Sequence, residues 1–363
     1  MKLSLRWLTR SYNRVTNTFI KPMSKRAVVL LNLGSPKSTS VGDVRTYLRE
    51  FLGDERVIDY PAVFRFALLE GIVLRTRPRK SAAAYKTVWT PEGAPLLVTT
   101  EKLRKKLEVA CGLPVITGMR YGEPSCAQAV DKLKEMGVDE VFVLPQYPHY
   151  AMSSYETVVV KFQEELLERA PGMRWQMLQP YFNDPAYIHA LVESAKPWLS
   201  KPFDKVLFSY HGVPERHLRK GDASKAHCTK IPNCCEVANP SHANCYRHQC
   251  TRTTELFRVA AGLRKDQVEL AFQSRFGPEQ WLRPYTDKRL EALPSEGVKN
   301  LLVMCPAFTA DCLETIEEIS EEGMEDFMHA GGESFQQIPC LNDQDIYVRY
   351  LADRVARWQP SHV

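Results

Sequence analysis

The sequence of 363 residues contains no continuous apolar run of about 18–20 residues, the length that a membrane-spanning helix requires. Its first 26 residues carry seven Lys or Arg and no acidic residue, but they lack the apolar run of about 7–15 residues that a secretory signal needs. The net charge is only +5 at pH 7, so the composition gives no indication of a nucleic-acid-binding protein. These absences predict a soluble globular protein of the cytoplasm.

Dinucleotide binding and disulfide bonding are also disfavoured. No G-x-G-x-x-G motif opens the first predicted helix, so a dinucleotide cofactor is not expected. Ten cysteines are present, but a reducing cytosol keeps thiols free, so disulfides explain them poorly. Five of the ten fall in HCTKIPNCCEVANPSHANCYRHQC, residues 227–250, while the others are scattered singly and read as small buried residues. The Cys-rich stretch therefore favours a metal site.

Buried strands alternate with amphipathic helices along the chain, which is typical of a parallel α/β sheet. The pattern begins with RAVVLLNLGSP at residues 26–36 and begins again after residue 170 with RWQMLQPY. We therefore predict two α/β domains with a ligand cleft between them. The predicted parts of the chain are a basic extension at residues 1–25, a first domain at 26–170, a second domain at 171–342 and a closing helix within 343–363.

Polar residues, glycines and prolines gather where the predicted strands end. Because parallel sheets bind ligands at the carboxyl ends of their strands, these residues predict a functional cleft, although turn residues that cap a sheet would look the same. They are Asn32, Gly34, Ser35, Pro36, Arg120, Tyr121, Gln146, Tyr147, Ser209, Tyr210, His211, Gln273, Ser274 and Arg275.

His211 and a row of glutamates are the candidates for chemistry. His211 ends a buried strand in FSYHGVP, where a neutral imidazole could accept a proton or ligate a metal, or could be structural. In MCPAFTADCLETIEEISEEG we expect Asp311 to cap a helix on which Glu314, Glu318 and Glu322 line one side. Such a row can bind a divalent metal, relay protons or form a solvated face. Its place at the carboxyl end of a strand favours the first two.

Two segments could meet a membrane surface. Residues 62–80, AVFRFALLEGIVLRTRPRK, are apolar through residue 74 and then basic. They fit either a buried helix that ends in cations or an exposed lip that contacts an apolar, anionic ligand and a membrane. In the basic extension, apolar residues recur at helical spacing between the arginines, which fits either an amphipathic helix on an anionic membrane or a frayed tail.

Seven sequence strings, in one order, resemble those of the ferrochelatases, the enzymes that insert ferrous iron into a porphyrin. They are LNLGSP, VWTPEGAPL, MRYGEP, LPQYPHYAMSS, SYHGVP, FQSRFGPEQWLRPYTD and CPAFTADCLETIEEI. The resemblance extends from about residue 26 to about residue 358, and it is greatest to the bacterial branch that uses protoporphyrin.

The resemblance implies two Rossmann-like, chelatase-type domains, each with a parallel four-stranded sheet flanked by helices, and a porphyrin cleft between them. It implies a lyase that inserts Fe²⁺ into protoporphyrin IX and releases two protons, the last step of haem biosynthesis. A related chelatase for coproporphyrin or for another tetrapyrrole or metal, and a non-catalytic haem or iron sensor, are the alternatives. The protein would be cytoplasmic, peripheral on the inner membrane through the lip and the basic extension, and a monomer or homodimer without nucleic acid.

The resemblance also assigns roles by motif. His211 would accept protons at the metal site, and Glu314 would face it across the porphyrin plane, so that both contact the substrate iron. Glu318 and Glu322, with Asp311, would form a path for protons or metal. The residues that would line the porphyrin pocket are Asn32, Gly34, Ser35, Pro36, Arg120, Tyr121, Tyr147, Ser154 and Trp281.

Compared with the simplest bacterial ferrochelatases, residues from about 228 to about 249 look like an insertion. Some relatives carry a [2Fe–2S] cluster on a C-terminal extension, but this chain has no cysteine after Cys340. The insertion offers C-x5-C-C-x9-C-x4-C, and four thiolates suffice for a [2Fe–2S] cluster or a structural Zn²⁺. We expect the cluster, with zinc as the alternative and with either Cys234 or Cys235 spare. The candidate ligands are four of Cys228, Cys234, Cys235, Cys245 and Cys250.

Overall fold

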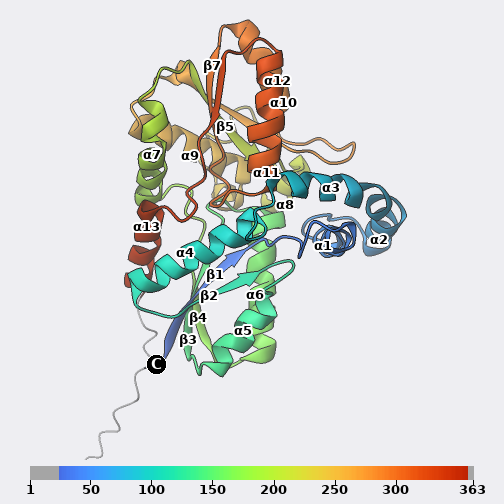
Figure 1. The fold of residues 1–363 in the computed structure, drawn as a ribbon, viewed down its shortest axis with the longest axis vertical. Coiled ribbons are helices and arrows are strands. Elements are labelled where there is room, and N and C mark those ends of the chain that lie inside the picture. The colour runs from blue at the N-terminus through green and yellow to red at the C-terminus, as the bar shows by residue number, and fades with distance from the viewer. Residues whose placement is uncertain (1–23, 359–363) are drawn as a thin grey trace, which may run out of the picture.

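The computed structural model describes residues 24–358, which form two parallel sheets with helices packed around them (Figure 1). Residues 1–23 and 359–363 lie outside the described residues, and with them most of the predicted basic extension. The elements up to the end of the first sheet are β1 (Arg26–Asn32), α1 (Val41–Gly53), α2 (Ala62–Leu68), the π-helical turn η1 (Leu69–Val73), α3 (Leu74–Val88), α4 (Pro95–Cys111), β2 (Val115–Met119), α5 (Cys126–Glu135), β3 (Glu140–Pro145), the π-helical turn η2 (Met152–Glu156), α6 (Thr157–Arg169) and β4 (Arg174–Met177).

The second part of the chain repeats this alternation of strand and helix. Its elements are α7 (Pro185–Leu199), β5 (Lys205–His211), α8 (Glu215–Gly221), the 3₁₀ turn η3 (Pro240–Asn244), α9 (Tyr246–Ala260), the 3₁₀ turn η4 (Lys265–Gln267), β6 (Val268–Gln273), α10 (Thr286–Ala292), the 3₁₀ turn η5 (Leu293–Glu296), β7 (Asn300–Met304), α11 (Leu313–Thr315), the π-helical segment η6 (Ile316–Gly323), α12 (Met324–His329), β8 (Ser334–Gln337) and α13 (Asp345–Ala356).

Both sheets have the same strand order. The first runs β2-β1-β3-β4 and the second β6-β5-β7-β8, and every pair of neighbours is parallel. Val28 and Leu30 of β1 pack into one buried cluster, whereas Val29 and Leu31 pack into another on the opposite face. Burial on both faces explains why this strand reads as a continuous apolar run rather than as an alternating pattern. The predicted α/β fold with two four-stranded parallel sheets is confirmed.

The boundary between the sheets lies later in the chain than predicted. RWQMLQPY was expected to open the second domain, but Arg174–Met177 forms β4, which pairs with β3 in the first sheet. β8, with the sequence SFQQ, was not predicted. Both strands lie at an edge of their sheet and are largely half-buried or exposed, so they lack the apolar run that marks a central strand.

Local signals explain where several helices begin. Ser125 starts α5 with a capping box, in which its hydroxyl and the side chain of Gln128 each accept a backbone N–H. Ser40 caps α1 by accepting the N–H of Asp43. Asp184 caps α7, which has a proline at its first position. Each of these helices follows a strand after a loop.

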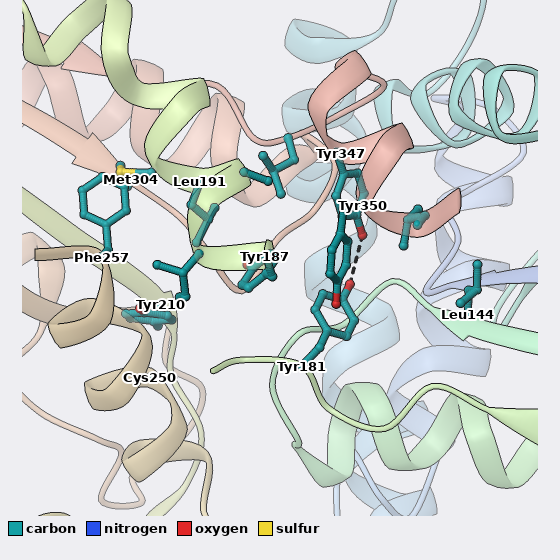
Figure 2. Packing of buried hydrophobic residues seen from close by; sticks show 14 of the residues in the cluster. Leu144, Tyr181, Tyr187, Leu191, Tyr210, Cys250, Phe257, Met304, Tyr347 and Tyr350 are labelled. Atoms are coloured by element: carbon teal, nitrogen blue, oxygen red, sulfur yellow. Dashed lines mark hydrogen bonds between the residues drawn. The ribbon is translucent and has the colours of Figure 1, made fainter. Parts of the chain in front are cut away.

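Helix α13 joins the two halves of the molecule. It packs against α4 of the first half and α7 of the second (Figure 1). The hydroxyl groups of Tyr181 and Tyr347 form a 2.9 Å hydrogen bond, which Figure 2 shows in the buried apolar cluster. The same cluster contains Leu30 of β1 and Phe208 of β5, so the two sheets share one core. Among residues 24–358, no helix is both long enough and apolar enough to cross a membrane.

Candidate active site at the carboxyl ends of the strands

His211 is the last residue of β5 and lies half-buried at the carboxyl end of the second sheet. Its Nδ1 atom lies 2.7 Å from the backbone oxygen of Gly212. Because a carbonyl oxygen can only accept, Nδ1 carries a proton, and in the neutral imidazole Nε2 has a free lone pair. This is the form of imidazole that can accept a proton or bind a metal.

Gly212, directly after His211, allows close packing at this strand end. A Cβ atom here would lie 2.8 Å from the backbone oxygen of Ser274 and 3.3 Å from Cε3 of Trp281. Trp281 donates its Nε1 hydrogen to the backbone oxygen of Phe276 over 2.9 Å. The indole ring is therefore held against the residue that follows His211.

The sequence predicted one continuous α-helix for the glutamate row, but Glu314 lies in the short α11, and Glu318 and Glu322 lie in the π-helical segment η6. Only Leu313–Thr315 is α-helical before η6, and α12 follows η6. A π-helix closes its hydrogen bonds from i to i+5, so side chains four residues apart no longer form one straight line. Glu314 and Glu318 are half-buried, whereas Glu322 is exposed. The row therefore runs from the interior of the site to the surface.

Asp311 does not cap this helix, contrary to the prediction. Cys312 is the N-cap residue, and its backbone N–H donates to the hydroxyl of Thr315 over 3.0 Å. The carboxylate of Asp311 accepts the side-chain amide of Asn342 over 2.6 Å and the hydroxyl of Thr315 over 3.0 Å. The chain begins its helical turn one residue later than expected, and Asp311 joins that turn to the segment after β8.

Burial raises the pKa values of two glutamates in this segment. It raises the pKa of Glu318, although the hydrogen bond from Ser274 and the nearby His211 favour the carboxylate. Burial also raises the pKa of Glu317 to about 7, and the neighbouring Glu322 and Glu318 add to this effect. Glu317 was not predicted to belong to the row. A π-helical turn brings residues five apart, such as Glu317 and Glu322, to the same side.

Helices of the first half also face Glu314. Burial raises the pKa of Tyr85 in α3 and of Tyr47 in α1, and in both cases the charge of Glu314 contributes. Burial likewise raises the pKa of the Cys312 thiol, which is further raised by the charge of Glu314 and a hydrogen bond to it. Neither tyrosine was predicted as a site residue. Both lie in helices and not at strand ends, so the strand-end rule did not mark them.

The loop at residues 32–36 packs against the segment that contains Arg120 and Tyr121. Gly34 has φ +101°, and a Cβ atom there would lie 1.8 Å from the backbone oxygen of Tyr121, so only glycine fits. Asn32 is buried and donates its side-chain amide to the hydroxyl of Thr100 over 3.1 Å. Ser35 and Pro36, the other predicted pocket residues of this loop, are also buried.

Arg120 and Tyr121 form a buried network with Asp54, which follows α1. Nη2 of Arg120 lies 2.5 Å from Oδ2 of Asp54, and the hydroxyl of Tyr121 donates to the same oxygen over 3.0 Å. The hydroxyl of Thr157 donates to it as well. Although burial opposes ionisation, these hydrogen bonds and the charge of Arg120 lower the pKa of Asp54. The network engages Nε and Nη2 of Arg120. No motif in the sequence marked Asp54.

Tyr147 and Ser154 follow β3, as predicted for a strand-end loop. Tyr147 is buried, and its hydroxyl has no hydrogen-bond partner among the described residues. A buried hydroxyl without a partner costs about 1–3 kcal/mol, so this group is well suited to bond a ligand. Ser154 is half-buried in η2.

A cavity of about 460 Å³ lies beside α2 and α8, and none of the predicted porphyrin or metal residues lines it. Its lining includes Asp59, whose buried carboxylate forms ion pairs with Arg216 and Lys220 of α8 and lies 3.3 Å from Nε2 of His217. These pairs connect the segment before α2 to the helix that follows His211. The cavity is therefore surrounded by charges that already have partners.

The segment at residues 62–80 is an exposed lip rather than a buried helix. Val63, Phe64, Phe66 and Ile72 are between 57% and 84% exposed. The opposite side of the segment, with Leu69, Val73 and Leu74, packs against α1. Figure 1 shows α2 at the outer edge of the molecule.

Histidines hold the backbone of the Cys-rich loop. Nε2 of His227 and Nε2 of His242 each lie 2.8 Å from the backbone oxygen of Cys234, and Nδ1 of His248 lies 2.7 Å from that of Cys235. The rings of His242 and His248 are stacked with their centroids 3.7 Å apart. These histidines donate to carbonyl groups, so their role is to fix the turn that contains the two adjacent cysteines.

The thiol of Cys245 interacts with two other thiols of the loop, those of Cys228 and Cys235. A hydrogen bond with Cys235 and burial raise the pKa of Cys245, which also interacts with Cys228. Burial raises the pKa of Cys228 to about 11 and that of Cys250 well above its usual range, the latter with a contribution from Cys245. Within residues 24–358, however, no three side chains of His, Cys, Asp or Glu are arranged so that they could hold one metal ion. The thiols have the chemistry of a metal site but not its arrangement.

Comparisons with known proteins agree with the motifs. A sequence profile of the ferrochelatase family matches residues 25–358. A ferrochelatase of Opitutus terrae is 53% identical over 344 residues, which are 94% of this chain and 100% of that protein. One of Ectopseudomonas mendocina is 47% identical over 331 residues, which are 91% of this chain and 97% of that protein.

Solved structures show the same fold at low identity. The sirohydrochlorin chelatase SirB from Bacillus subtilis subspecies spizizenii, in complex with cobalt, has a TM-score of 0.50 at 11% identity, over 92% of this chain and 94% of that chain. This likeness supports the chelatase-type arrangement of two parallel sheets. The match of the family profile and the identity over nearly the whole chain go further, and they show that the chain belongs to the ferrochelatase family.

Proposed function

We propose that this ferrochelatase is a lyase that inserts Fe²⁺ into protoporphyrin IX and releases two protons, the last step of haem biosynthesis. The proposal rests on one observation: His211, whose Nδ1 is bonded to the backbone oxygen of Gly212, shares a half-buried site with the side chains of Glu314 and Glu318. Two pyrrole N–H bonds must break while a divalent cation enters, and imidazole and carboxylate groups can accept protons and bind the cation. The nitrogen lone pairs bind the iron, and no electron is transferred.

We assign the proton and metal route to the glutamates. His211 would accept pyrrole protons through Nε2, because Nδ1 is bonded to Gly212. The charge of Glu314 contributes to the raised pKa of Glu318, and the charges of Glu318 and the exposed Glu322 contribute to that of Glu317. The route would thus end at the surface. Asp311 has structural partners on both sides, so we give it the task of fixing the first turn.

The porphyrin would lie against aromatic groups from both halves. Trp281 beside Gly212 and the buried Tyr147 offer flat apolar surface, and Tyr147 and Ser154 offer hydroxyl groups. Because Asp54 occupies Arg120, we propose that Arg120 orients Tyr121 and the loop at residues 32–36 instead of binding a propionate.

An assay with two porphyrins tests this function. Protein purified without oxygen is mixed with Fe²⁺ and either protoporphyrin IX or coproporphyrin, and loss of porphyrin fluorescence is followed. The apolar lip favours the substrate with two carboxylates, so protoporphyrin IX should turn over faster at equal concentration. A preference for coproporphyrin would assign the protein to a related chelatase. Binding of porphyrin without turnover would support the sensor.

We propose that the lip attaches the protein to the cytoplasmic face of the inner membrane. The exposed side chains of Val63, Phe64, Phe66 and Ile72 would enter the lipid, and basic residues farther along the segment would meet anionic headgroups. Co-sedimentation with vesicles that contain phosphatidylglycerol should fall strongly in the double variant Phe64→Ser, Phe66→Ser. Equal sedimentation of the variant and the parent protein would rule out this attachment.

We also propose that the Cys-rich loop carries a [2Fe–2S] cluster. The support is chemical: five cysteines lie within 23 residues, and the thiol of Cys245 interacts with those of Cys228 and Cys235. Cys228, Cys235, Cys245 and Cys250 are the set that the contacts favour, and their side chains would have to close around the metal. Assays of iron, sulfide and zinc on protein purified without oxygen, with an optical spectrum, decide. One zinc in a colourless protein would favour the structural alternative, and free thiols alone would exclude both.

A further inference from the structure

Gln273 and Ser274 stand at the carboxyl end of β6, directly beside the strand that ends in His211. In the register of the sheet, His211 is paired with Gln273. Both residues belong to the group of polar residues that the sequence places at strand ends, but the function described so far gives neither a role. Both residues form hydrogen bonds with residues of the glutamate row.

The side chain of Gln273 is buried and is bonded at both ends of its amide. Oε1 accepts the hydroxyl of Ser209 over 2.8 Å. Nε2 donates to the backbone oxygen of Glu314 over 2.9 Å and lies 3.4 Å from Oε2 of Glu318. Because the acceptor and donor ends are both satisfied, the amide has one orientation. Gln273 therefore connects the strand of His211 to the first turn of the glutamate segment.

Ser274 makes a more direct contact. Its hydroxyl donates to Oε2 of Glu318 over 2.5 Å. Its backbone has φ +59°, in the left-handed region that glycine adopts without cost and that serine rarely adopts. Since glycine would suit the backbone better, the hydroxyl group is the feature that makes serine useful here.

We propose that Ser274, supported by Gln273, is a positioning residue that holds Glu318 in place for proton or iron transfer. Both donors bond Oε2 of Glu318, so Oε1 stays available for a proton or a cation. The carboxylate is thereby kept within electrostatic reach of His211 and Glu314. The inference rests on the proposed function, because it gives Ser274 a task in the insertion reaction.

The test compares Ser274→Gly with Ser274→Asn in the full-length protein. Glycine keeps the backbone conformation and removes the donor, while asparagine tolerates the left-handed region and brings a donating amide. Ser274→Gly should lower kcat for Fe²⁺ insertion about tenfold, since the lost hydrogen bond is to a charged group, with KM for porphyrin within about twofold. Ser274→Asn should recover most of the rate. Ser200→Gly, at an exposed position after α7, is the matched control.

A double-variant cycle identifies the partner. If Ser274 acts through Glu318, Ser274→Gly should change kcat by less than about twofold when Glu318→Gln is already present. Full tenfold losses that multiply would overturn the proposal. Hydrogen exchange of the peptide at residues 313–323 gives a readout that needs no activity, and it should be faster in Ser274→Gly than in the parent protein and in Ser200→Gly.

The two readouts separate this inference from the function on which it rests. An inactive parent protein with faster exchange in Ser274→Gly would contradict the proposed function and keep the positioning of Glu318. An active parent protein with unchanged exchange and unchanged kcat in Ser274→Gly would keep the function and overturn the role of Ser274.

Discussion

The site at His211 and the Cys-rich loop both gather side chains that bind metals, but the protein holds them in different ways. At the site, Ser274 and Gln273 bond Glu318 and the backbone of Glu314 directly. In the loop, three histidines bond the backbone of the adjacent cysteines, and the thiols contact one another. Residues at the end of the sheet thus hold the carboxylates in place, whereas a bound metal would be needed to complete the arrangement of the thiols. A geometry set by the fold persists without its ligand, and a geometry completed by a metal does not.

The largest effect should come from removing the chemical groups that the sheet holds. Glu314→Gln keeps the shape of the side chain and removes the carboxylate, and His211→Ala removes the base. Each should lower the rate of iron insertion by at least about 100-fold, because positioned acid–base groups contribute about 10²–10⁴. Porphyrin binding, measured by fluorescence, should persist, since the other site residues remain in place.

Glu325→Gln, at an exposed position in α12, is the control for the loss of a negative charge near the row. Its rate should match that of the parent protein. If Glu314→Gln retained more than about a tenth of the parent rate, Glu314 would be a wall of the site and not part of its chemistry.

A smaller and more selective effect should separate the two adjacent cysteines of the loop. Cys235 contacts the thiol of Cys245, whereas Cys234 uses its backbone oxygen to accept two histidine side chains. Cys235→Ser should therefore lose most of the bound iron and sulfide, or zinc, while Cys234→Ser should retain it. Both are measured per chain after purification without oxygen.

Equal metal content in the two variants would show that the contacts described for the loop do not determine which cysteines bind the metal. A parent protein without metal would remove the basis of the prediction. In either variant, Fe²⁺ insertion supplied with excess iron should fall less than in Glu314→Gln, because the loop transfers no electrons in a reaction that requires none.

The sequence predicted the buried central strands better than the partly exposed strands at the sheet edges. β1 and β5 are central strands with unbroken apolar runs, and His211 follows from the end of β5. β4 and β8 lie at sheet edges and carry too little apolar sequence, so β4 was assigned to the second sheet and β8 was missed. Burial leaves a pattern in the sequence, and a weakly buried strand leaves little.

The glutamate row shows a second limit. LETIEEISEEG has the spacing of an amphipathic α-helix, and nothing in it indicates that η6 adopts a π-helical form. The residues that contact this segment, such as Gln273, lie more than 40 residues away in the chain. The place of Glu317 in the row follows from the π-helical form, so this place could not be predicted from the sequence. The same holds for Asp54, whose partners Arg120 and Thr157 come from later elements.

The smallest expected effect is on stability and concerns Glu317 in the glutamate row. Burial and the neighbouring Glu322 and Glu318 raise its pKa to about 7, whereas an unfolded chain would give a value near 4.5. Between these values the folded state keeps a proton that the unfolded state has lost. The free energy of unfolding should therefore fall as the pH rises from about 4.5 to about 7, and change no further above it.

Glu317→Gln should remove this part of the pH dependence. Because the side chain is only partly buried, solvent screening reduces the effect to about 1 kcal/mol at pH 8 in favour of the variant. Urea unfolding of the metal-free protein from pH 5 to pH 8 measures it, with Glu325→Gln as the exposed control. Parallel pH curves for Glu317→Gln and the parent protein would place Glu317 in solvent, outside the row. A flatter curve for Glu317→Gln alone would mean that the carboxylates of the site repel one another. A bound proton or cation, such as the Fe²⁺ substrate, would relieve this repulsion.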